Sequence, residues 1–176
     1  MDPRGTEPAF RGRFLSVDVE DWPGQPLHEV LHRPGAAAVL PITPSGEVIL
    51  VRQFRPAVRQ VTTEIPAGVL DVEGEDALTC ATRELHEETG HRLTVIEFLA
   101  GYYASVGFTD EYVHLFWAEA EGESEGEPEV GIEVIRRPLG EMVTAARNGK
   151  VRDAKTAMAL LLADGRARPS GLGPGR

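Results

Sequence analysis

The sequence predicts an α+β fold in which a mixed β-sheet lies between helices. Short apolar segments rich in β-branched residues, separated by turn residues, occupy much of positions 14–65 and 94–136. A helix with an apolar stripe is expected at 76–89, and two more are expected at 139–148 and 153–163. A chain of 176 residues, 41% of them hydrophobic, can form one such domain with a sizeable core.

Two hairpins are expected to begin the sheet, after a loose tail at residues 1–8. Pro23-Gly24 provides the turn of the first hairpin, and Pro44-Ser45-Gly46 provides the turn of the second. The expected strands of the two hairpins are residues 14–19 and 28–32, then 36–42 and 48–53. A further short strand is expected at residues 61–65.

The helix at residues 76–89 has the clearest signals of the three. Acidic residues precede it, and Gly90 can adopt the left-handed conformation that commonly ends a helix. The expected buried stripe of this helix comprises Leu78, Ala81 and Leu85. Cys80 is the single cysteine of the chain, so it has no intrachain disulfide partner and is expected to be a small buried hydrophobic residue.

The remaining elements follow from alternating apolar patterns and from composition. The expected strands are residues 94–104, 112–120 and 133–136. Residues 121–129 are acidic and contain glycine, which is typical of a solvated surface loop. Residues 166–176 are rich in Gly, Pro and Arg, and we expect a disordered tail there.

Composition also restricts the partners of the protein. The net charge of −10 and the pI near 5.0 argue against broad binding to nucleic acid or to an anionic membrane. Residues 1–14 contain no apolar run of the signal-peptide type, and the apolar run at 158–163 is too short to span a bilayer. We therefore expect a soluble cytoplasmic protein.

Three carboxylates are crowded on the helix at residues 76–89. Glu84, Glu87 and Glu88 are spaced i, i+3, i+4 and share one helical face. Like charges at this spacing repel each other by roughly 0.2–0.5 kcal/mol per exposed pair. A solvated acidic face is one interpretation. The other is a site for Mg²⁺ or Mn²⁺, which prefer carboxylate oxygens and turn the repulsion into attraction.

These carboxylates belong to a longer motif. It consists of Glu75, seven further residues, and then Arg83-Glu84-Leu85-His86-Glu87-Glu88-Thr89-Gly90. This motif resembles the signature of the Nudix hydrolase family. There are two departures from the family pattern. Six residues, 69–74, separate Gly68 from Glu75 instead of the five of the family pattern, so this segment contains one extra residue. His91 occupies a position that is apolar in the signature.

The resemblance continues outside this motif, from about Phe10 to about Ala163. Residues 51–57, 64–68 and 107–111 are similar to the branch of the family that contains ADP-ribose pyrophosphatases. Many of those enzymes have Ser-Pro-Gly where this chain has Ser105-Val106-Gly107.

The resemblance implies the Nudix fold, an α/β/α sandwich, at residues 35–165. It also implies an N-terminal strand extension at residues 1–34 and a tail at 166–176. Related ADP-ribose enzymes are dimers in which the N-terminal strands pack across the partner. We therefore expect a homodimer formed through residues 1–34.

The activity implied by the resemblance is metal-dependent hydrolysis of the pyrophosphate bond of ADP-ribose to AMP and ribose 5-phosphate. The cofactor would be Mg²⁺ or Mn²⁺. One alternative is the same chemistry on another nucleoside diphosphate sugar, such as GDP-mannose, or on a dinucleotide. Another is a non-catalytic Nudix domain that senses a nucleotide. Such a domain would be expected to lose catalytic carboxylates, and this chain keeps them.

The family pattern assigns roles to the residues of the helix and of the loop before it. The implied metal ligands are the carbonyl of Ala67 and the side chains of Glu84, Glu87 and Glu88. Glu87 is either a direct ligand or a partner of one. Arg83 is spaced to form an ion pair with Glu87, and Glu75 would brace the loop.

Further site residues are implied outside the helix. Glu111 is the candidate general base, since a base can lie outside the helix if it reaches the attacking water. Arg55 would contact the phosphates or the terminal ribose, and Glu64 would bind sugar hydroxyls. Gly68 and Phe108 complete the implied substrate site. The candidates for stacking on the adenine, which the sequence leaves undecided, are Trp22, Trp117, Tyr102 and Tyr103.

Overall fold

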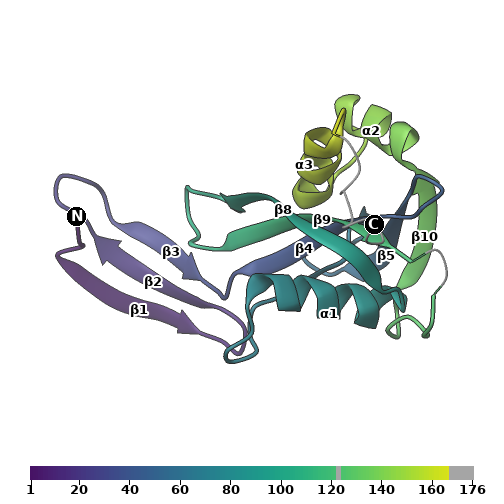
Figure 1. The fold of residues 1–176 in the computed structure, drawn as a ribbon. Helices are drawn as coiled ribbons and strands as arrows, with labels where there is room; N and C mark the ends of the chain where they lie inside the picture. The colour runs from purple at the N-terminus through teal and green to yellow at the C-terminus, as the bar shows by residue number, and fades with distance from the viewer. Residues whose placement is uncertain (122–123, 167–176) are drawn as a thin grey trace, which may run out of the picture.

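The computed structural model describes residues 1–121 and 124–166, and it confirms an α+β fold (Figure 1). The strands are β1 (Gly5–Arg11), β2 (Ser16–Asp21), β3 (His28–His32), β4 (Ala36–Ile42), β5 (Glu47–Arg55), β6 (Gln60–Glu64), β7 (Ala67–Val69), β8 (Leu93–Tyr103), β9 (Tyr112–Ala120) and β10 (Glu133–Pro138). The helices are α1 (Ala77–Thr89), α2 (Leu139–Arg147) and α3 (Ala154–Ala163). Every expected strand and helix is present within a few residues. The loose tail expected at residues 1–8 is wrong, because β1 begins at Gly5.

The larger of two sheets is mixed, as expected. Its strand order is β10-β5-β4-β9-β8, with β6 paired to β5 and β7 paired to β4. The β4–β9 pair is parallel and the other pairs are antiparallel. This topology places β4 in the middle of the sheet, where it is covered on both faces.

The alternation of side chains along β4 shows how the helices cover the sheet. Ala37 and Val39 pack in the cluster that contains the buried residues of α1. Ala38, Leu40 and Ile42 pack in the other cluster, with the buried residues of α2 and α3. Successive residues of a strand point to opposite faces, so α1 covers one face and α2 and α3 cover the other (Figure 1).

Helix α1 has well-formed ends and a buried face. The Asp76 carboxylate accepts a hydrogen bond from the Thr79 N–H at 2.8 Å, and Gly90 ends the helix with φ of 69°. The buried residues are Cys80, Ala81, Leu85, Glu88 and Thr89. The expectation that Leu78 is buried is wrong, since it is 45% exposed. Leu78 lies in the first turn, before the buried part of the helix begins.

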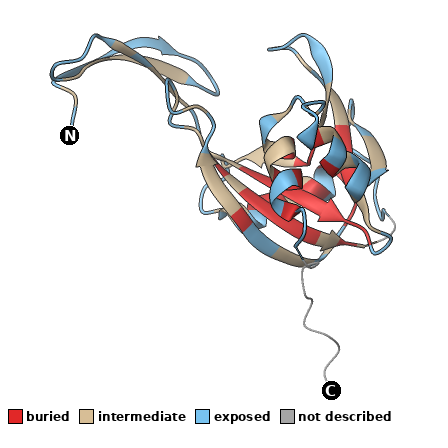
Figure 2. Cartoon of the chain, turned by 90° about the horizontal axis from the view of Figure 1, so that it is seen from above, coloured by how far each residue is buried: buried red, intermediate tan, exposed pale blue. Residues whose placement is uncertain are grey.

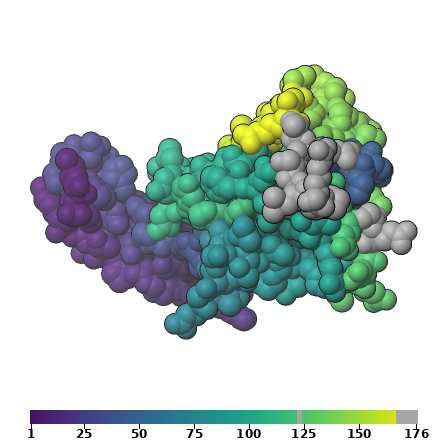
Figure 3. Space-filling view, viewed as in Figure 1, coloured from purple at the N-terminus to yellow at the C-terminus, as the bar shows by residue number. Residues whose placement is uncertain are grey.

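Strands β1, β2 and β3 form a separate antiparallel sheet that we call the N-terminal arm, residues 5–32. Figures 2 and 3 show the arm projecting from one end of the main body. Every residue of β1 is exposed, and Phe10 and Phe14 are 53% and 68% exposed.

The arm contacts the main body through the connection between β8 and β9. The Leu31 N–H donates to the Phe108 carbonyl at 2.7 Å, and the Asp110 N–H donates to the Leu31 carbonyl at 3.4 Å. The His32 imidazole lies 2.5 Å from the Asp110 carboxylate and 3.5 Å from that of Asp18. The β8–β9 connection is therefore held in place by β3.

The acidic segment expected at residues 121–129 is exposed from Ser124 to Glu129, as predicted, but its backbone is anchored on α1. The Glu125 N–H donates to the Gly90 carbonyl at 2.9 Å, and the Glu129 N–H donates to the Glu87 carbonyl at 3.2 Å. Residues 167–176 of the expected disordered tail lie outside the described residues. In the part of the chain that is described, no helix is both long enough and apolar enough to cross a bilayer.

The packing of α1 predicts different effects for two of its leucines. Leu85→Ala should lower the free energy of unfolding by about 2–5 kcal/mol, because Leu85 is fully buried. Leu78→Ala, the matched control on the same helix, should change it by about 0.5 kcal/mol or less. Urea unfolding of the metal-free proteins measures both values. Equal losses would contradict the packing described for α1.

Candidate active site on helix α1

Strand β7 brings the backbone into close contact with the carboxylates of α1. A Cβ atom added at Gly68 would lie 1.9 Å from Cδ of Glu84, so the glycine is required by the approach of that side chain. The Ala67 N–H donates to Oε2 of Glu88 at 3.1 Å. The extra residue before Glu75 is taken up in a turn in which Gly74 has a φ of 80°. The insertion therefore leaves the contact between β7 and α1 intact.

Arg83 links three carboxylates. Its Nε and Nη2 atoms donate to both oxygens of Glu75, at 2.8 and 2.9 Å. Its Nη1 donates to Glu84 at 2.7 Å and to Glu87 at 2.9 Å. These hydrogen bonds raise the pKa of Arg83, with the bond to Glu75 contributing most. The expected ion pair with Glu87 is present, and Glu75 holds the guanidinium in position.

Glu84 and Glu88 are carboxylates in a poorly solvated environment. Glu88 is 5% exposed, and burial raises its pKa to about 7 despite the hydrogen bond from Ala67. Burial also raises the pKa of Glu84, against the lowering effect of Arg83. No described residue forms an ion pair with Glu88. A divalent cation fits this donor set, since it would offset the cost of ionising both side chains.

The metal-binding arrangement is not preformed. Within residues 1–121 and 124–166, no three His, Cys, Asp or Glu side chains are grouped closely enough to hold a metal ion. The physical reason is that Arg83 holds Glu84 and Glu87, while Glu88 is turned toward the Ala67 N–H. Arg83 binds only Oε1 of Glu84, so the second oxygen of this carboxylate could bind a metal while the ion pair is kept.

Arg55 and Glu64 form a second charged network beside α1. Arg55 donates to both oxygens of Glu64 at 2.7 and 2.8 Å, and the Thr62 hydroxyl donates at 2.6 Å. Burial alone would raise the pKa of Glu64, but Arg55 and Lys155 together lower it to about 2. The positive charge of Arg55 also acts on Glu88. Glu64 therefore positions Arg55, and its own oxygens already accept hydrogen bonds within the protein.

Lys155 was not predicted as a site residue. It pairs with Glu64 and, at 2.9 Å, with Asp153, which caps α3. The cap has a local signal in the sequence, because Asp153 precedes Thr156 by three residues. The pairing of Lys155 with Glu64 has no local signal in the sequence, since these two residues are far apart in the chain.

Glu111 lies on the side of the N-terminal arm. Its carboxylate is 3.3 Å from Nε of Arg33, and the side chain is 17% exposed. Among the described residues, Glu111 forms no hydrogen bond or ion pair with the carboxylates of α1. In the same connection the Phe108 side chain is 55% exposed, and its backbone carbonyl is bound by β3.

Glu129 was also missed as a site residue. Its negative charge raises the pKa of both Glu84 and Glu88, and its N–H donates to the Glu87 carbonyl. The acidic composition of residues 121–129 was visible in the sequence but indicated only a solvated loop. The fold brings this loop back onto α1 and adds a further carboxylate near the site.

Of the candidates for stacking, Trp117 is in the core at 2% exposed, and Trp22 donates from its indole to Glu20 within the arm. Tyr102 is partly buried, and burial raises the pKa of its hydroxyl to about 12. The Tyr103 ring packs edge-on against Tyr112, with 5.1 Å between the ring centroids. Tyr102 and Tyr103 therefore remain the candidates for stacking on a base.

His91, which departs from the apolar position of the signature, is 2% exposed. Its Nδ1 lies 3.0 Å from the Thr89 carbonyl, and its Nε2 lies 2.9 Å from Nη2 of Arg136. The guanidinium can only donate, so Nε2 accepts and the imidazole is neutral. Burial accordingly lowers the pKa of His91. The histidine thus serves as a buried link between α1 and β10.

Residues 31–160 match the NUDIX domain. The chain is 37% identical over 162 residues to the ADP-ribose pyrophosphatase of Bacillus subtilis, covering 88% of this chain and 87% of the relative. The protein belongs to the Nudix family. It is also 34% identical over 163 residues to the methanol dehydrogenase activator of Bacillus methanolicus, covering 88% of each chain.

Two further matches extend this comparison. A GDP-mannose pyrophosphatase of Cronobacter sakazakii is 35% identical over 137 residues, covering 72% of this Nudix chain and 71% of the relative. The crystal structure of an ADP compounds hydrolase superposes with a TM-score of 0.75 at 23% identity, covering 93% of this chain and 92% of the other. At that identity the structural match shows the shared fold.

The raised pKa of Glu88 predicts how stability depends on pH in the metal-free protein. The folded-state pKa of about 7 lies above the ordinary value of 4.5, so the folded state binds the proton more tightly. The stability from this group is fully present below about pH 4.5 and is lost as the pH rises through about 7. In EDTA, the free energy of unfolding of the wild type should fall relative to that of Glu88→Gln as the pH rises from about 4.5 through about 7. A difference that stays constant with pH would contradict the assignment.

Proposed function

We propose that this Nudix protein is a metal-dependent pyrophosphatase that hydrolyses ADP-ribose to AMP and ribose 5-phosphate. The observation that carries the proposal is the similarity to the B. subtilis ADP-ribose pyrophosphatase along most of both chains. The residues of the Nudix signature support it, since Glu75, Arg83, Glu84, Glu87 and Glu88 are all present and all contribute to one site.

In this proposal Glu84, Glu87 and Glu88, with the carbonyl of Ala67, hold Mg²⁺ or Mn²⁺. A divalent cation there would screen the charge of a diphosphate and lower the pKa of a bound water. Arg83 would remain bound to Glu75, and its bonds to Glu84 and Glu87 would orient those two carboxylates. Gly90 supports the arrangement by ending α1 directly after this turn.

The substrate groups on either side of the diphosphate would meet residues outside α1. Arg55, held by Glu64, directs its charge toward Glu88 and would contact the phosphates or the terminal ribose. Gly68 would allow the backbone of β7 to lie against Glu84 beside the substrate, and the exposed Phe108 ring would border the substrate. The expected contact of Glu64 with sugar hydroxyls becomes an indirect one, through Arg55.

The main alternative is the same hydrolysis on GDP-mannose, and it is favoured by the GDP-mannose pyrophosphatases among the relatives. The α1 carboxylates would not distinguish the two substrates, because in this proposal they act only on the metal and the diphosphate. Dinucleotides remain a further alternative for the same reason. A non-catalytic sensor is disfavoured, since such a domain would be expected to lose the carboxylates that this chain keeps.

We further propose a cytoplasmic homodimer that associates through the N-terminal arm, without nucleic-acid or membrane partners. The exposed apolar side chains Phe10, Phe14 and Leu27 of the arm support a protein contact. Multi-angle light scattering should give twice the mass of one chain. Removal of residues 1–34 should give a single-chain mass, and a monomeric full-length protein would contradict the proposal.

The activity is tested with ADP-ribose, GDP-mannose and a dinucleotide in the presence of Mg²⁺ or Mn²⁺. ADP-ribose should have the highest kcat/KM, and EDTA should abolish turnover. Glu88→Gln should fold but lose activity by roughly a hundredfold or more, because a charged catalytic contact is removed. Preferential hydrolysis of GDP-mannose would make GDP-mannose the substrate in place of ADP-ribose. Near-native activity of Glu88→Gln would remove Glu88 from the mechanism.

A second kinetic comparison concerns the general base. Glu111 is the candidate from the family pattern, whereas Glu129 is the one whose charge acts on Glu84 and Glu88. If one of these two residues is the general base, its replacement by Gln should lower kcat by roughly 10²–10⁴-fold and leave the affinity for Mg²⁺ nearly unchanged. Glu111→Gln and Glu129→Gln serve as controls for each other. Unchanged kcat in both would place the base elsewhere.

A further inference from the structure

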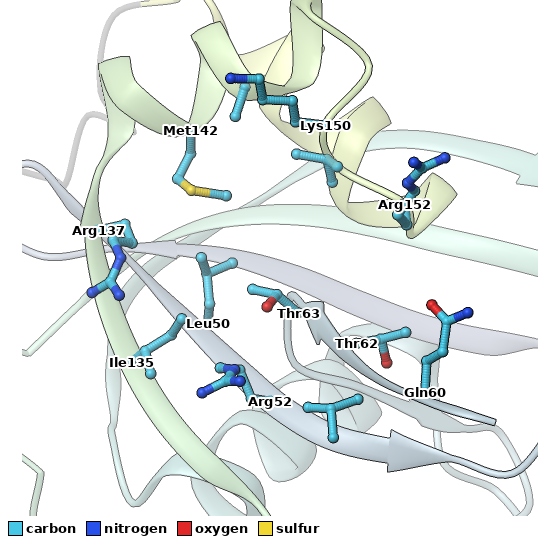
Figure 4. A pocket seen from close by; sticks show the side chains of 13 residues that line it. Leu50, Arg52, Gln60, Thr62, Thr63, Ile135, Arg137, Met142, Lys150 and Arg152 are labelled. Carbon is cyan, nitrogen blue, oxygen red and sulfur yellow. The ribbon is translucent and has the colours of Figure 1, made fainter. Parts of the chain in front are cut away.

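A cavity of about 370 Å³ lies beside α2, over one face of β10, β5 and β6 (Figure 4). Strand register places Leu50 opposite Ile135, and Arg52 opposite Thr63. Leu50 and Arg52 are two residues apart, so these four side chains share one face of the sheet. It is the face on which Leu50 packs with the residues of α2 and α3, opposite the face that α1 covers.

Positive charge is concentrated around this cavity. Arg52 comes from β5, Arg137 from β10, and Lys150 and Arg152 from the connection between α2 and α3 (Figure 4). None of the described residues that line the cavity is an Asp or a Glu. This is unusual in a chain whose net charge is −10. An anion repelled by most of this protein would be attracted here.

The cations of the cavity are only partly neutralised by the protein. Arg52 forms an ion pair with the exposed Glu133 at 2.7 Å, and Arg137 donates to the neutral Arg136 carbonyl. Lys150 and Arg152 are exposed, and within the described ranges neither forms an ion pair. Like charges that face one pocket repel each other, so a bound anion would lower the electrostatic energy of the group.

The rest of the lining indicates the kind of anion. The partly buried Ile135 and Met142 provide an apolar surface, and Thr63 adds a hydroxyl group. The volume lies within the range of pockets that bind small molecules, roughly 300–1,000 Å³. Inorganic phosphate would use the charges but leave the apolar surface uncovered. A nucleoside monophosphate offers both a dianion for the Arg and Lys side chains and a flat apolar base.

We propose that this basic pocket is a second binding site of the protein, separate from the α1 carboxylates, and that it takes a nucleoside monophosphate. The phosphate is held by Lys150 and Arg152, with Arg52 and Arg137 contributing charge, and the base lies on the apolar floor. The site does not depend on the proposed pyrophosphatase activity.

The test is a titration of the full-length, metal-free protein with AMP, followed by backbone amide chemical shifts. The amides of Thr62, Thr63 and Val151 should shift in a saturable way. The double variant Lys150→Gln/Arg152→Gln should bind AMP at least about tenfold more weakly at the pocket, since two charge-assisted contacts are lost. Both side chains are exposed, so the variant should fold, which thermal unfolding verifies.

Arg147→Gln is the matched control, because it removes the same charge nearby from a residue that pairs with Asp164 and does not line the cavity. It should bind AMP like wild type. Inorganic phosphate should shift the same amides with lower affinity, and adenosine should bind more weakly than AMP. The proposal is overturned if the double variant keeps its AMP affinity, if the shifts are confined to the surroundings of Glu88, or if adenosine binds as tightly as AMP.

Discussion

The close approach of β7 to α1 is the constraint on which the site depends. It places the Gly68 backbone against Glu84 and the Ala67 N–H against Glu88, so two carboxylates of α1 are largely removed from water. Such burial is unfavourable without a compensating positive charge. Arg83, fixed by Glu75, supplies part of that charge to Glu84 but not to Glu88. The raised pKa of Glu88 shows that the Ala67 N–H and the charge of Arg55 offset this burial only in part, and a divalent cation would offset the rest.

The elements around α1 position its remaining neighbours through long-range contacts. The N-terminal arm holds the β8–β9 connection, with Phe108 and Glu111, through backbone hydrogen bonds to Leu31. The segment after β9 returns to α1 and brings Glu129 close to the carboxylates. The start of α3 contributes Lys155 to the buried Glu64. The site is thus assembled from segments that are distant in the chain, around one helix whose own spacing is local.

Local patterns predicted most of the fold correctly. The turns at Pro23-Gly24 and Pro44-Ser45-Gly46, the apolar run of β4 and the glycine that ends α1 are each determined by neighbouring residues. The two wrong predictions concern features that residues nearby in the sequence do not determine. β1 is an exposed strand with no apolar face toward the body, so its sequence has the appearance of a tail. Leu78 follows the helical period, but the sheet buries α1 only from Cys80 onward.

The sequence by itself determined the mixed α+β fold, the family and the carboxylate face of α1, because helical periodicity fixes which of these side chains share a face. Only the tertiary structure decided which charges meet. It paired Arg55 and Lys155 with Glu64, brought Glu129 rather than Glu111 into electrostatic contact with α1, and gathered the basic residues beside α2. These contacts depend on strand register and on the return of distant loops, which no local pattern encodes. The strength of each charge depends in turn on its burial, which exists only once the chain has folded.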